Sequence, residues 1–251
     1  MGKDFFKRMI LGEWFNMLTA IIEKQYISKD KIKVVEKADI NHISNVYRLG
    51  IGDQVRVIDG EYEYLTKIIE LSKKEIVLEV EQKNEDIYSL NINIDIALGI
   101  LKNDKMNLAI QKLTEIGIRK IVPLHTERVI VKLNEKKEKW ETIANETLKQ
   151  CKGVKFTEVS PISKFKDIDY KKYDKILYAY ENSNDSKSIH EVVSAEDKNV
   201  LYIIGPEGGI TIEEVLFLKE KGAIEISLGK RILRAETAAI VVGGALANIY
   251  K

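Results

Sequence analysis

The sequence predicts an α/β fold with a largely parallel sheet, preceded by a small β-barrel of short strands. Three observations favour this class. Residues 31–81 contain four short stretches of strand-forming residues, and an Asp59-Gly60 pair separates two of them. From residue 92 onward, short apolar runs alternate with segments whose apolar residues recur every three or four positions. The length of 251 residues is ample for a buried core in each part.

The first part of the chain is the predicted barrel, with expected strands over residues 31–36, 54–59, 62–71 and 75–81 and a short helix over 39–49. Asp59-Gly60 indicates a hairpin turn, because both residues tolerate a positive φ. Residues 7–23, at the N-terminus, look helical. The polar segment 82–86 is the expected linker, which assigns residues 1–82 to the barrel domain and 83–251 to the α/β domain.

The second part alternates between strands and helices. The expected strands cover residues 92–100, 121–124, 175–180, 200–204 and 224–228, and the expected helices cover 106–116, 140–151, 212–221 and 236–250. Gly117 is placed to end the first of these helices. The last helix is apolar almost all round, so it is expected to be deeply buried or to form an oligomer interface.

Composition limits the classes of function. Lys and Arg number 40 and Asp and Glu 39, so any surface that binds nucleic acid must be a local patch. The single cysteine and three scattered histidines predict neither a disulfide nor a metal site. The apolar stretch 9–22 is too short and too polar to span a membrane, and we expect a cytoplasmic protein.

A glycine-rich loop follows the predicted strand 200–204 and reads Gly205-Pro206-Glu207-Gly208-Gly209-Ile210-Thr211. Its glycines let the backbone turn sharply and approach a ligand closely. Thr211 and Glu214 form the pattern of a capping box for the next helix. Ligands bind at such loops in open α/β sheets, although a tight turn without a ligand fits the pattern equally well. A phosphate cradle is disfavoured, because no Lys-Ser/Thr pair follows the glycines.

A second loop follows the predicted strand 224–228 and opens the last helix. It reads Leu228-Gly229-Lys230-Arg231-Ile232-Leu233-Arg234-Ala235-Glu236-Thr237-Ala238. Two arginines and a glutamate stand among apolar residues where a cleft is expected. The alternative is a solvated loop in which Arg231 pairs with Glu236.

Together, the two loops closely resemble the signature segments of the RsmE-type ribosomal RNA methyltransferases of the SPOUT superfamily. The similarity continues through Ile110–Gly117, Ile121–Leu124 and Thr126–Arg128, and weakly through Asp39–Asp59. The resemblance implies a PUA-like β-barrel in front of a SPOUT domain whose parallel sheet carries a C-terminal trefoil knot. It also implies a homodimer, with S-adenosyl-L-methionine as cofactor and no metal.

The resemblance further implies transfer of a methyl group to N3 of a specific uridine in 16S rRNA of the small ribosomal subunit. The expected cofactor-binding residues are Tyr180, Ile204, Gly205, Pro206, Glu207, Gly208, Gly209, Leu228, Gly229, Ile232, Leu233 and Ala238. Since the imide of uracil is a weak acid, a cation near O2 or O4 is needed to stabilise its anion.

We therefore expect Arg234 to stabilise that anion and Glu207 or Glu236 to accept the proton. The expected RNA-binding residues are Arg48, Arg56 and Arg231. Two other functions stay open at this point. One is a SPOUT methyltransferase that acts on another RNA position, and the other is a catalytically inactive protein for RNA binding or ribosome assembly.

Overall fold

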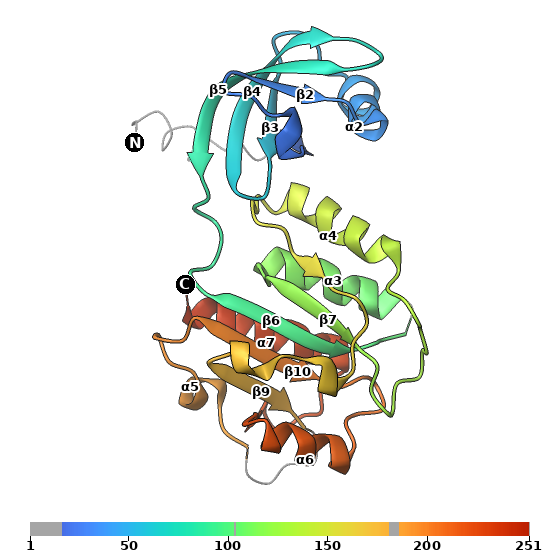
Figure 1. The fold of residues 1–251 in the computed structure, drawn as a ribbon, viewed down its shortest axis with the longest axis vertical. Coiled ribbons are helices and arrows are strands. Elements are labelled where there is room, and N and C mark those ends of the chain that lie inside the picture. The colour runs from blue at the N-terminus through green and yellow to red at the C-terminus, as the bar shows by residue number, and fades with distance from the viewer. Residues whose placement is uncertain (1–16, 103, 181–185, 251) are drawn as a thin grey trace. The chain divides into compact units, whose positions relative to one another are not determined.

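Figure 1 shows the computed structural model of the chain, which describes residues 17–102, 104–180 and 186–250. The chain forms two compact units that divide between Tyr88 and Ser89. Each unit has its own sheet and its own apolar core.

The first unit is a curled, five-stranded mixed sheet with the order β1-β3-β4-β5-β2 (Figure 1). Its strands are β1 (Thr19–Ile21), β2 (Lys31–Val34), β3 (Gln54–Ile58), β4 (Tyr62–Leu71) and β5 (Ile76–Glu85). β1 runs parallel to β3 and the other neighbours are antiparallel. The described part of the unit also contains the short helices η1 (Lys24–Tyr26), α2 (Lys37–Asn41) and η2 (His42–Val46). The predicted short strands and short helix are thus confirmed.

The hairpin expected at Asp59-Gly60 joins β3 to β4. Gly60 has a φ of 90°, and the Asp59 carboxylate accepts hydrogen bonds from the backbone N–H groups of Glu61 and Tyr62 at 2.8 and 2.7 Å.

Two expectations about the ends of this unit are wrong. Residues 82–85 are not a linker, because they extend β5 and pair with β4. The helix expected over residues 7–23 is contradicted at Thr19–Ile21, which pair with β3 as a strand. Pairing with a neighbouring strand outweighed the local pattern in both places. Residues 7–16 of that expected helix lie outside the described residues.

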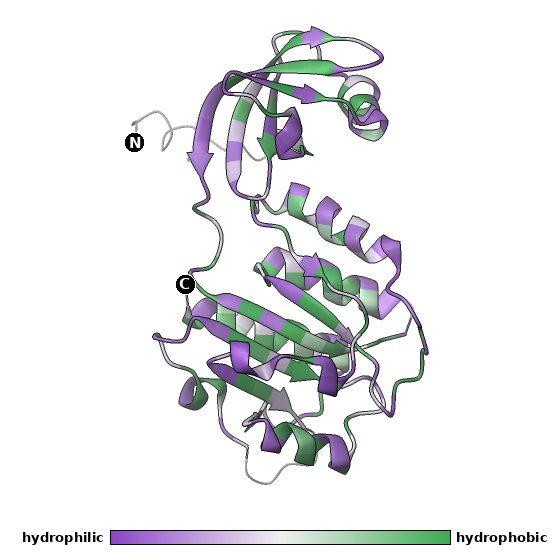
Figure 2. Ribbon diagram, viewed as in Figure 1, coloured by the Kyte–Doolittle hydropathy of each residue, from purple (hydrophilic) through white to green (hydrophobic). Residues whose placement is uncertain are grey.

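The second unit has a six-stranded sheet with the order β11-β9-β10-β6-β7-β8, in which every pair of neighbours is parallel. Its strands are β6 (Asn93–Gly99), β7 (Lys120–Leu124), β8 (Glu158–Val159), β9 (Lys175–Ala179), β10 (Asn199–Ile204) and β11 (Ile224–Ile226). Residues 200–204 of β10 are buried on both faces, as a covered parallel sheet requires. Figure 2 shows these central strands as mostly apolar. The predicted parallel α/β sheet is confirmed.

Helices cover both faces of this sheet. One face packs against α3 (Asp104–Ile116), α4 (Glu138–Gln150), α5 (Ile189–Val192) and α7 (Ala235–Ile249). The other face packs against α6 (Ile212–Glu220) and the short η3 (Phe165–Asp167) and η4 (Tyr170–Lys172). Gly117 ends α3 as predicted, with a φ of 92°, and the next N–H bonds back to the carbonyl of Leu113 at 3.0 Å.

The last helix, α7, lies flat on the sheet. The Tyr202 hydroxyl of β10 donates a hydrogen bond to the carbonyl of Ala239 at 3.1 Å, and a Cβ at Gly243 would lie 2.8 Å from that hydroxyl. The buried side of α7 confirms the expected deep packing, while Val241 on its other side is 44% exposed. No helix among the described residues combines the length and apolarity needed to cross a membrane.

Candidate cofactor and substrate site

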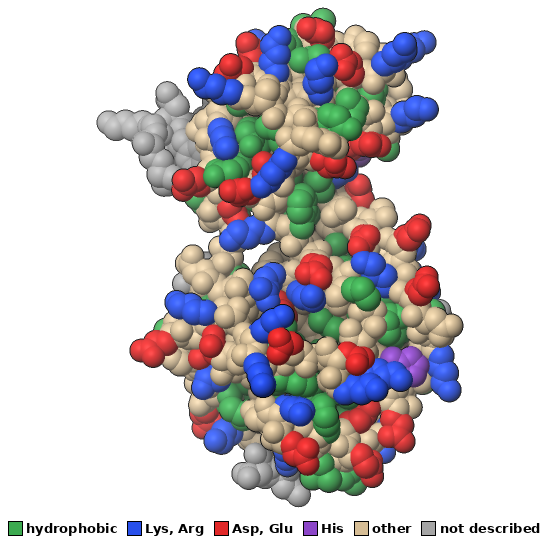
Figure 3. Space-filling model, in the orientation of Figure 1, with side chains coloured by type: hydrophobic (Ala, Val, Ile, Leu, Met, Phe, Trp, Pro, Cys, Tyr) green, Lys and Arg blue, Asp and Glu red, His purple; other side chains and the backbone are tan. Residues whose placement is uncertain are grey.

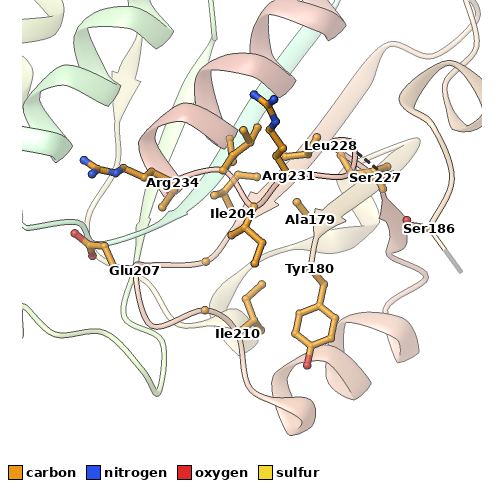
Figure 4. A pocket seen from close by; sticks show the side chains of 18 of the residues that line it. Ala179, Tyr180, Ser186, Ile204, Glu207, Ile210, Ser227, Leu228, Arg231 and Arg234 are labelled. Carbon is orange, nitrogen blue, oxygen red and sulfur yellow. Dashed lines mark hydrogen bonds between the residues drawn. The ribbon is translucent and has the colours of Figure 1, made fainter. Parts of the chain in front are cut away.

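A cavity of about 770 Å³ opens at the carboxyl ends of β9, β10 and β11 (Figure 4). This volume is in the range of small-molecule sites, which hold roughly 300–1,000 Å³. The three strands are parallel and adjacent, so the loops that follow them meet at one edge of the sheet. The two loops singled out in the sequence form most of the wall, and every expected cofactor-binding residue except Gly208 lines the cavity.

The glycine loop is tightly packed, because a side chain would fit neither at Gly205 in the loop nor at Gly99, which contacts it. A Cβ at Gly205 would lie 2.7 Å from Ile210 Cγ1, and a Cβ at Gly99, at the end of β6, would lie 2.3 Å from the backbone nitrogen of Pro206. The capping box predicted for α6 is formed, since Thr211 N donates to Glu214 at 2.9 Å and Glu214 N donates to Thr211 Oγ1 at 3.2 Å. The loop therefore presents backbone groups to the cavity in a fixed geometry.

Gly208 faces away from the cavity and contacts the segment after β7. A Cβ there would lie 2.6 Å from the carbonyl oxygen of Arg128. The same segment is tied to α6, because the backbone N–H of Glu127 donates to Glu214 at 2.9 Å. Gly208 thus permits close backbone packing behind the loop.

The second loop closes the opposite wall and begins α7. Gly229 has a φ of 97°, and its N–H donates to Ser227 Oγ at 3.2 Å. Arg234 is the N-cap residue of α7, with extended backbone, so its side chain projects from the helix start at the rim of the cavity. Arg231 and Ile232 are exposed on the same rim, Ile232 by 82%.

Both units of the chain are similar to known protein families. Residues 89–247 match the model of the RNA methyltransferase domain, and residues 35–81 match the model of the RNA methyltransferase PUA domain. The chain is 33% identical to ribosomal RNA small subunit methyltransferase E of Bacillus subtilis over 231 residues. The aligned segment covers 86% of this chain and 90% of the Bacillus protein.

The chain belongs to the ribosomal RNA small subunit methyltransferase E family. The relative of the same name from Rickettsia conorii is 30% identical over 87% of this chain and 90% of its own length.

Solved structures share the fold of this family member. A putative methyltransferase from Legionella pneumophila, in complex with bound SAM, is 26% identical, with a TM-score of 0.81 over 93% of this chain and 98% of that one. The small subunit methyltransferase E of Neisseria gonorrhoeae, solved with S-adenosyl methionine, is 23% identical and has a TM-score of 0.82 over 94% and 98% of the two chains.

The rim of the cavity is rich in cations. Lys105, Lys230, Arg231 and Arg234 line it, and Glu207 is the one acidic residue among the described lining residues. Among the described residues, the side chains of Arg231 and Arg234 have no hydrogen-bond or ion-pair partner. Arg231 therefore forms no ion pair with Glu236, and the alternative of a solvated loop that contains this pair is not supported.

Glu207 is bound on one side. Its Oε1 accepts hydrogen bonds from the backbone N–H of Lys102 at 3.2 Å and from Lys105 Nζ at 3.4 Å. Burial raises the pKa of Glu207, but backbone hydrogen bonds and the Lys105 ammonium outweigh burial and lower that pKa overall. Its Oε2 is buried and has no hydrogen-bond partner among the described residues.

Glu236, the other acidic candidate, does not line the cavity. It lies in the first turn of α7 and is 7% exposed. The periodicity of the last helix could have indicated this burial. Glu236 is three residues before the buried Ala239, so both lie on the same side of α7.

The tyrosines after β9 separate into two environments. Tyr178 is fully buried and donates from its hydroxyl to Glu225 at 2.9 Å, so it belongs to the core. Tyr180 lines the cavity, and Figure 4 shows it with Ser186 on the side opposite Glu207 and Arg234. Lys105, Ser186, Ser227 and Ile210 also line the cavity but were missed by sequence reasoning. Lys105 stands 102 residues before Glu207, so no local pattern could have joined them.

Arg56 cannot contact RNA as expected. Its side chain is 3% exposed, and its Nε donates to the Glu63 carboxylate, also 3% exposed, at 2.5 Å. A buried guanidinium that is already paired offers no surface to a phosphate. Arg48, in contrast, is exposed in the first unit and has a left-handed backbone with a φ of 57°.

The charged surface is mixed rather than uniformly basic. Figure 3 shows Lys and Arg interspersed with Asp and Glu over the face in view, as the net charge of +1 predicts. No group of three or more His, Cys, Asp or Glu among the described residues is arranged to hold a metal ion.

Proposed function

We propose that the chain transfers a methyl group from S-adenosyl-L-methionine to N3 of a specific uridine in 16S rRNA of the small ribosomal subunit. One observation carries the proposal. The two signature loops, 205–209 and 228–238, close a single cavity that has apolar walls and a cationic rim. Relatives named small subunit methyltransferase E, and a related methyltransferase solved with SAM, support the same cofactor and a ribosomal substrate.

The cavity fits the cofactor by its chemistry. Apolar side chains suit an adenine ring, and these come from Ala179, Ile204, Ile210, Ile226, Leu228, Leu233 and Ala238. The tightly held glycine loop offers backbone amides and carbonyls for the polar edge of the nucleoside. When bound, the cofactor supplies an electrophilic methyl group, and the protein aligns the acceptor nitrogen with it.

Arg234 is the residue we assign to the charge that develops on uracil. As N3 loses its proton, negative charge spreads to O2 and O4, and a guanidinium beside either oxygen stabilises the anion. Arg234 lines the cavity and has no side-chain partner among the described residues, so its donors are available to a ligand.

RNA contacts are proposed for the exposed Arg48 and for Arg231 at the rim. We assign RNA binding to the barrel unit, which ends at Tyr88, and catalysis to the unit that begins at Ser89. We also propose a cytoplasmic location, which a ribosomal substrate supports.

We also propose a trefoil knot and a homodimer. The chain leaves β10 through α6 and returns to the far side of β9 as β11, and α7 then packs back against α3 and β6. This crossing supports threading of the C-terminal segments. The apolar helix α7 exposes Val241 on the side away from the sheet, and this supports the packing of a second copy of the chain against that side.

The decisive experiment incubates the purified protein with labelled S-adenosyl-L-methionine and either small ribosomal subunits or naked rRNA, followed by mass spectrometry of the nucleosides. We expect 3-methyluridine at one site. A label on another base or on ribose would replace the N3 assignment with another RNA position. Calorimetry that detects no cofactor binding would instead favour an inactive RNA-binding or assembly protein.

The role of Arg234 has its own test. Arg234→Ala is expected to lower turnover by about 100-fold while the Kd for S-adenosyl-L-methionine changes by less than about threefold. Equal loss of both would leave Arg234 with a structural role only.

A further inference from the structure

The charged groups on the Glu207 side of the cavity differ in what they can offer a substrate. Glu207 Oε1 is already bonded to Lys102 N and Lys105 Nζ, and Oε2 is buried below the surface. A carboxylate in this state is a poor acceptor for a proton from a base in the cavity. The lowered pKa of Glu207 points the same way, because a weaker base takes up a proton less readily.

Lys105 has the opposite character. Its side chain is 36% exposed, against 18% for Glu207, and it lines the cavity from the first turn of α3. An ammonium group has three donors, and the contact with Glu207 uses one of them. Among the described residues the other two donors have no partner, so they can face a ligand, and Glu207 fixes where they stand.

We propose that Lys105, positioned by Glu207, is a second cation that contacts a carbonyl oxygen of the target uracil, while Arg234 contacts the other. This inference rests on the function proposed above and changes one part of it. Glu207 acts through Lys105 as a positioning residue and is not the base.

The reaction needs no side chain of the protein as its base. The N3–H proton passes to water or hydroxide, and the two cations lower the cost of the anion that remains. The N3 electron pair then forms the new N–CH₃ bond while the bond between that carbon and sulfur breaks. Sulfur keeps the electron pair of the broken bond, and the neutral thioether product leaves.

The same arrangement selects uracil over cytosine. Uracil presents an acceptor oxygen at position 4, whereas cytosine presents an amino group whose hydrogens would face the donors of whichever cation, Lys105 or Arg234, contacts that position. A donor that meets another donor is left unsatisfied, and this is the kind of mismatch that proteins use to reject a close analogue.

The main test compares Lys105→Met with Lys198→Met as the matched loss of one lysine charge. Lys198 is exposed at the amino end of β10, the end of the sheet away from the cavity. We expect Lys105→Met to lower turnover by about 100-fold on the uridine substrate, with the cofactor Kd within about threefold of wild type. Lys198→Met should keep wild-type turnover.

A substrate with a more acidic imide tests whether Lys105 stabilises the N3 anion or only maintains the fold. In an RNA that carries 5-fluorouridine at the target position, fluorine withdraws electrons and already stabilises the N3 anion. We expect Lys105→Met to recover at least about tenfold of its loss on this RNA, because less help is needed from the missing cation. A variant whose fold is damaged would be equally slow on both RNAs, and that result would overturn the role of Lys105.

A double-mutant cycle tests the role of Glu207. If Glu207 acts through Lys105, Glu207→Gln slows the wild type but adds no further loss to Lys105→Met. Losses that multiply would show an independent role for Glu207, such as the base, and would overturn its assignment as a positioning residue. Lys105→Arg, which keeps the charge, should retain more activity than Lys105→Met and guards against a variant that fails to fold.

The two proposals fail in different ways. If the wild-type protein methylates no uridine N3, the function itself is wrong, and this inference falls with it. If the wild type is active and Lys105→Met matches Lys198→Met, the function stands and only the role of Lys105 is lost.

Discussion

The contact between Gly99 and the glycine loop gives the sharpest prediction about the cavity. Gly99 is the last residue of β6, and a Cβ there would lie 2.3 Å from Pro206 N, 2.5 Å from Pro206 Cδ and 2.9 Å from the carbonyl carbon of Gly205. All three atoms belong to backbone or to a proline ring, so none can rotate away. Gly99→Ala therefore forces the loop and the strand end apart.

The magnitude follows from the required displacement. Bringing the closest contact from 2.3 Å to an ordinary 3.4 Å needs a shift of 1.1 Å, which is 3.4 minus 2.3. Overpacking of this kind costs about 1–3 kcal/mol of folding free energy. In a unit of this size each kcal/mol lowers the Tm by about 2–4 °C, so a decrease of roughly 2–12 °C is expected. A 1 Å displacement of a wall that contacts the ligand lowers function by about 100-fold in well-fitted sites.

A methyl-transfer assay measures the loss of function and thermal unfolding of the same preparation measures the loss of stability, while calorimetry with S-adenosyl-L-methionine reports the cofactor affinity. The matched control is Gly50→Ala in the first unit, where the nearest atom, Asp53 Oδ2, lies 3.9 Å from the added Cβ. We expect the control to bind the cofactor as the wild type does. A Gly99→Ala protein with unchanged cofactor affinity and unchanged Tm would refute the claim that the end of β6 fixes the glycine loop.

Three further predictions concern single side chains. Arg56→Met should cost the first unit about 3–5 kcal/mol, because it leaves the Glu63 carboxylate buried without its partner, whereas Arg56→Met with Glu63→Leu should restore much of that stability in chemical unfolding. An equally unstable double variant would contradict the buried pair. Thr211→Ala should lower the free energy of unfolding by about 1 kcal/mol through loss of the α6 cap, as measured by urea unfolding; no change would mean that the cap does not contribute. Glu207→Gln tests the pH dependence of stability. Since the pKa of Glu207 is lowered from the ordinary 4.5, its carboxylate stabilises the fold above that pH, and the advantage is lost as pH falls through the lowered pKa. The difference in Tm between wild type and Glu207→Gln should therefore be full at neutral pH and shrink in acid, and a difference that is constant with pH would oppose the assignment.

The element types were largely decided by local sequence. Apolar runs bounded by polar residues identified β6, β7, β9 and β10, and three-to-four spacing identified α3 and α4. The helices α6 and α7 were also predicted, α7 as a segment that is apolar almost all round. The cap at Thr211 and the turn at Gly60 were also readable, because each depends on residues close together in the chain.

Elements that exist only through pairing were missed. β1 and β8 have three and two residues and gain their hydrogen bonds from β3 and β7, which no local pattern contains. The extension of β5 through Glu85 has the same cause, since polar residues continue a strand when a neighbour supplies the ladder.

The site divides in the same way. The sequence by itself determined the two loops that line the cavity, because the glycines, the arginines and the resemblance to a known family are all local features. Only the tertiary structure decided which charges are available. It buried Arg56 against Glu63, turned Glu236 out of the cavity, and placed Lys105 beside Glu207. The physical reason is that a side chain's charge is written in the sequence, whereas its solvation and its partners are set by residues far along the chain.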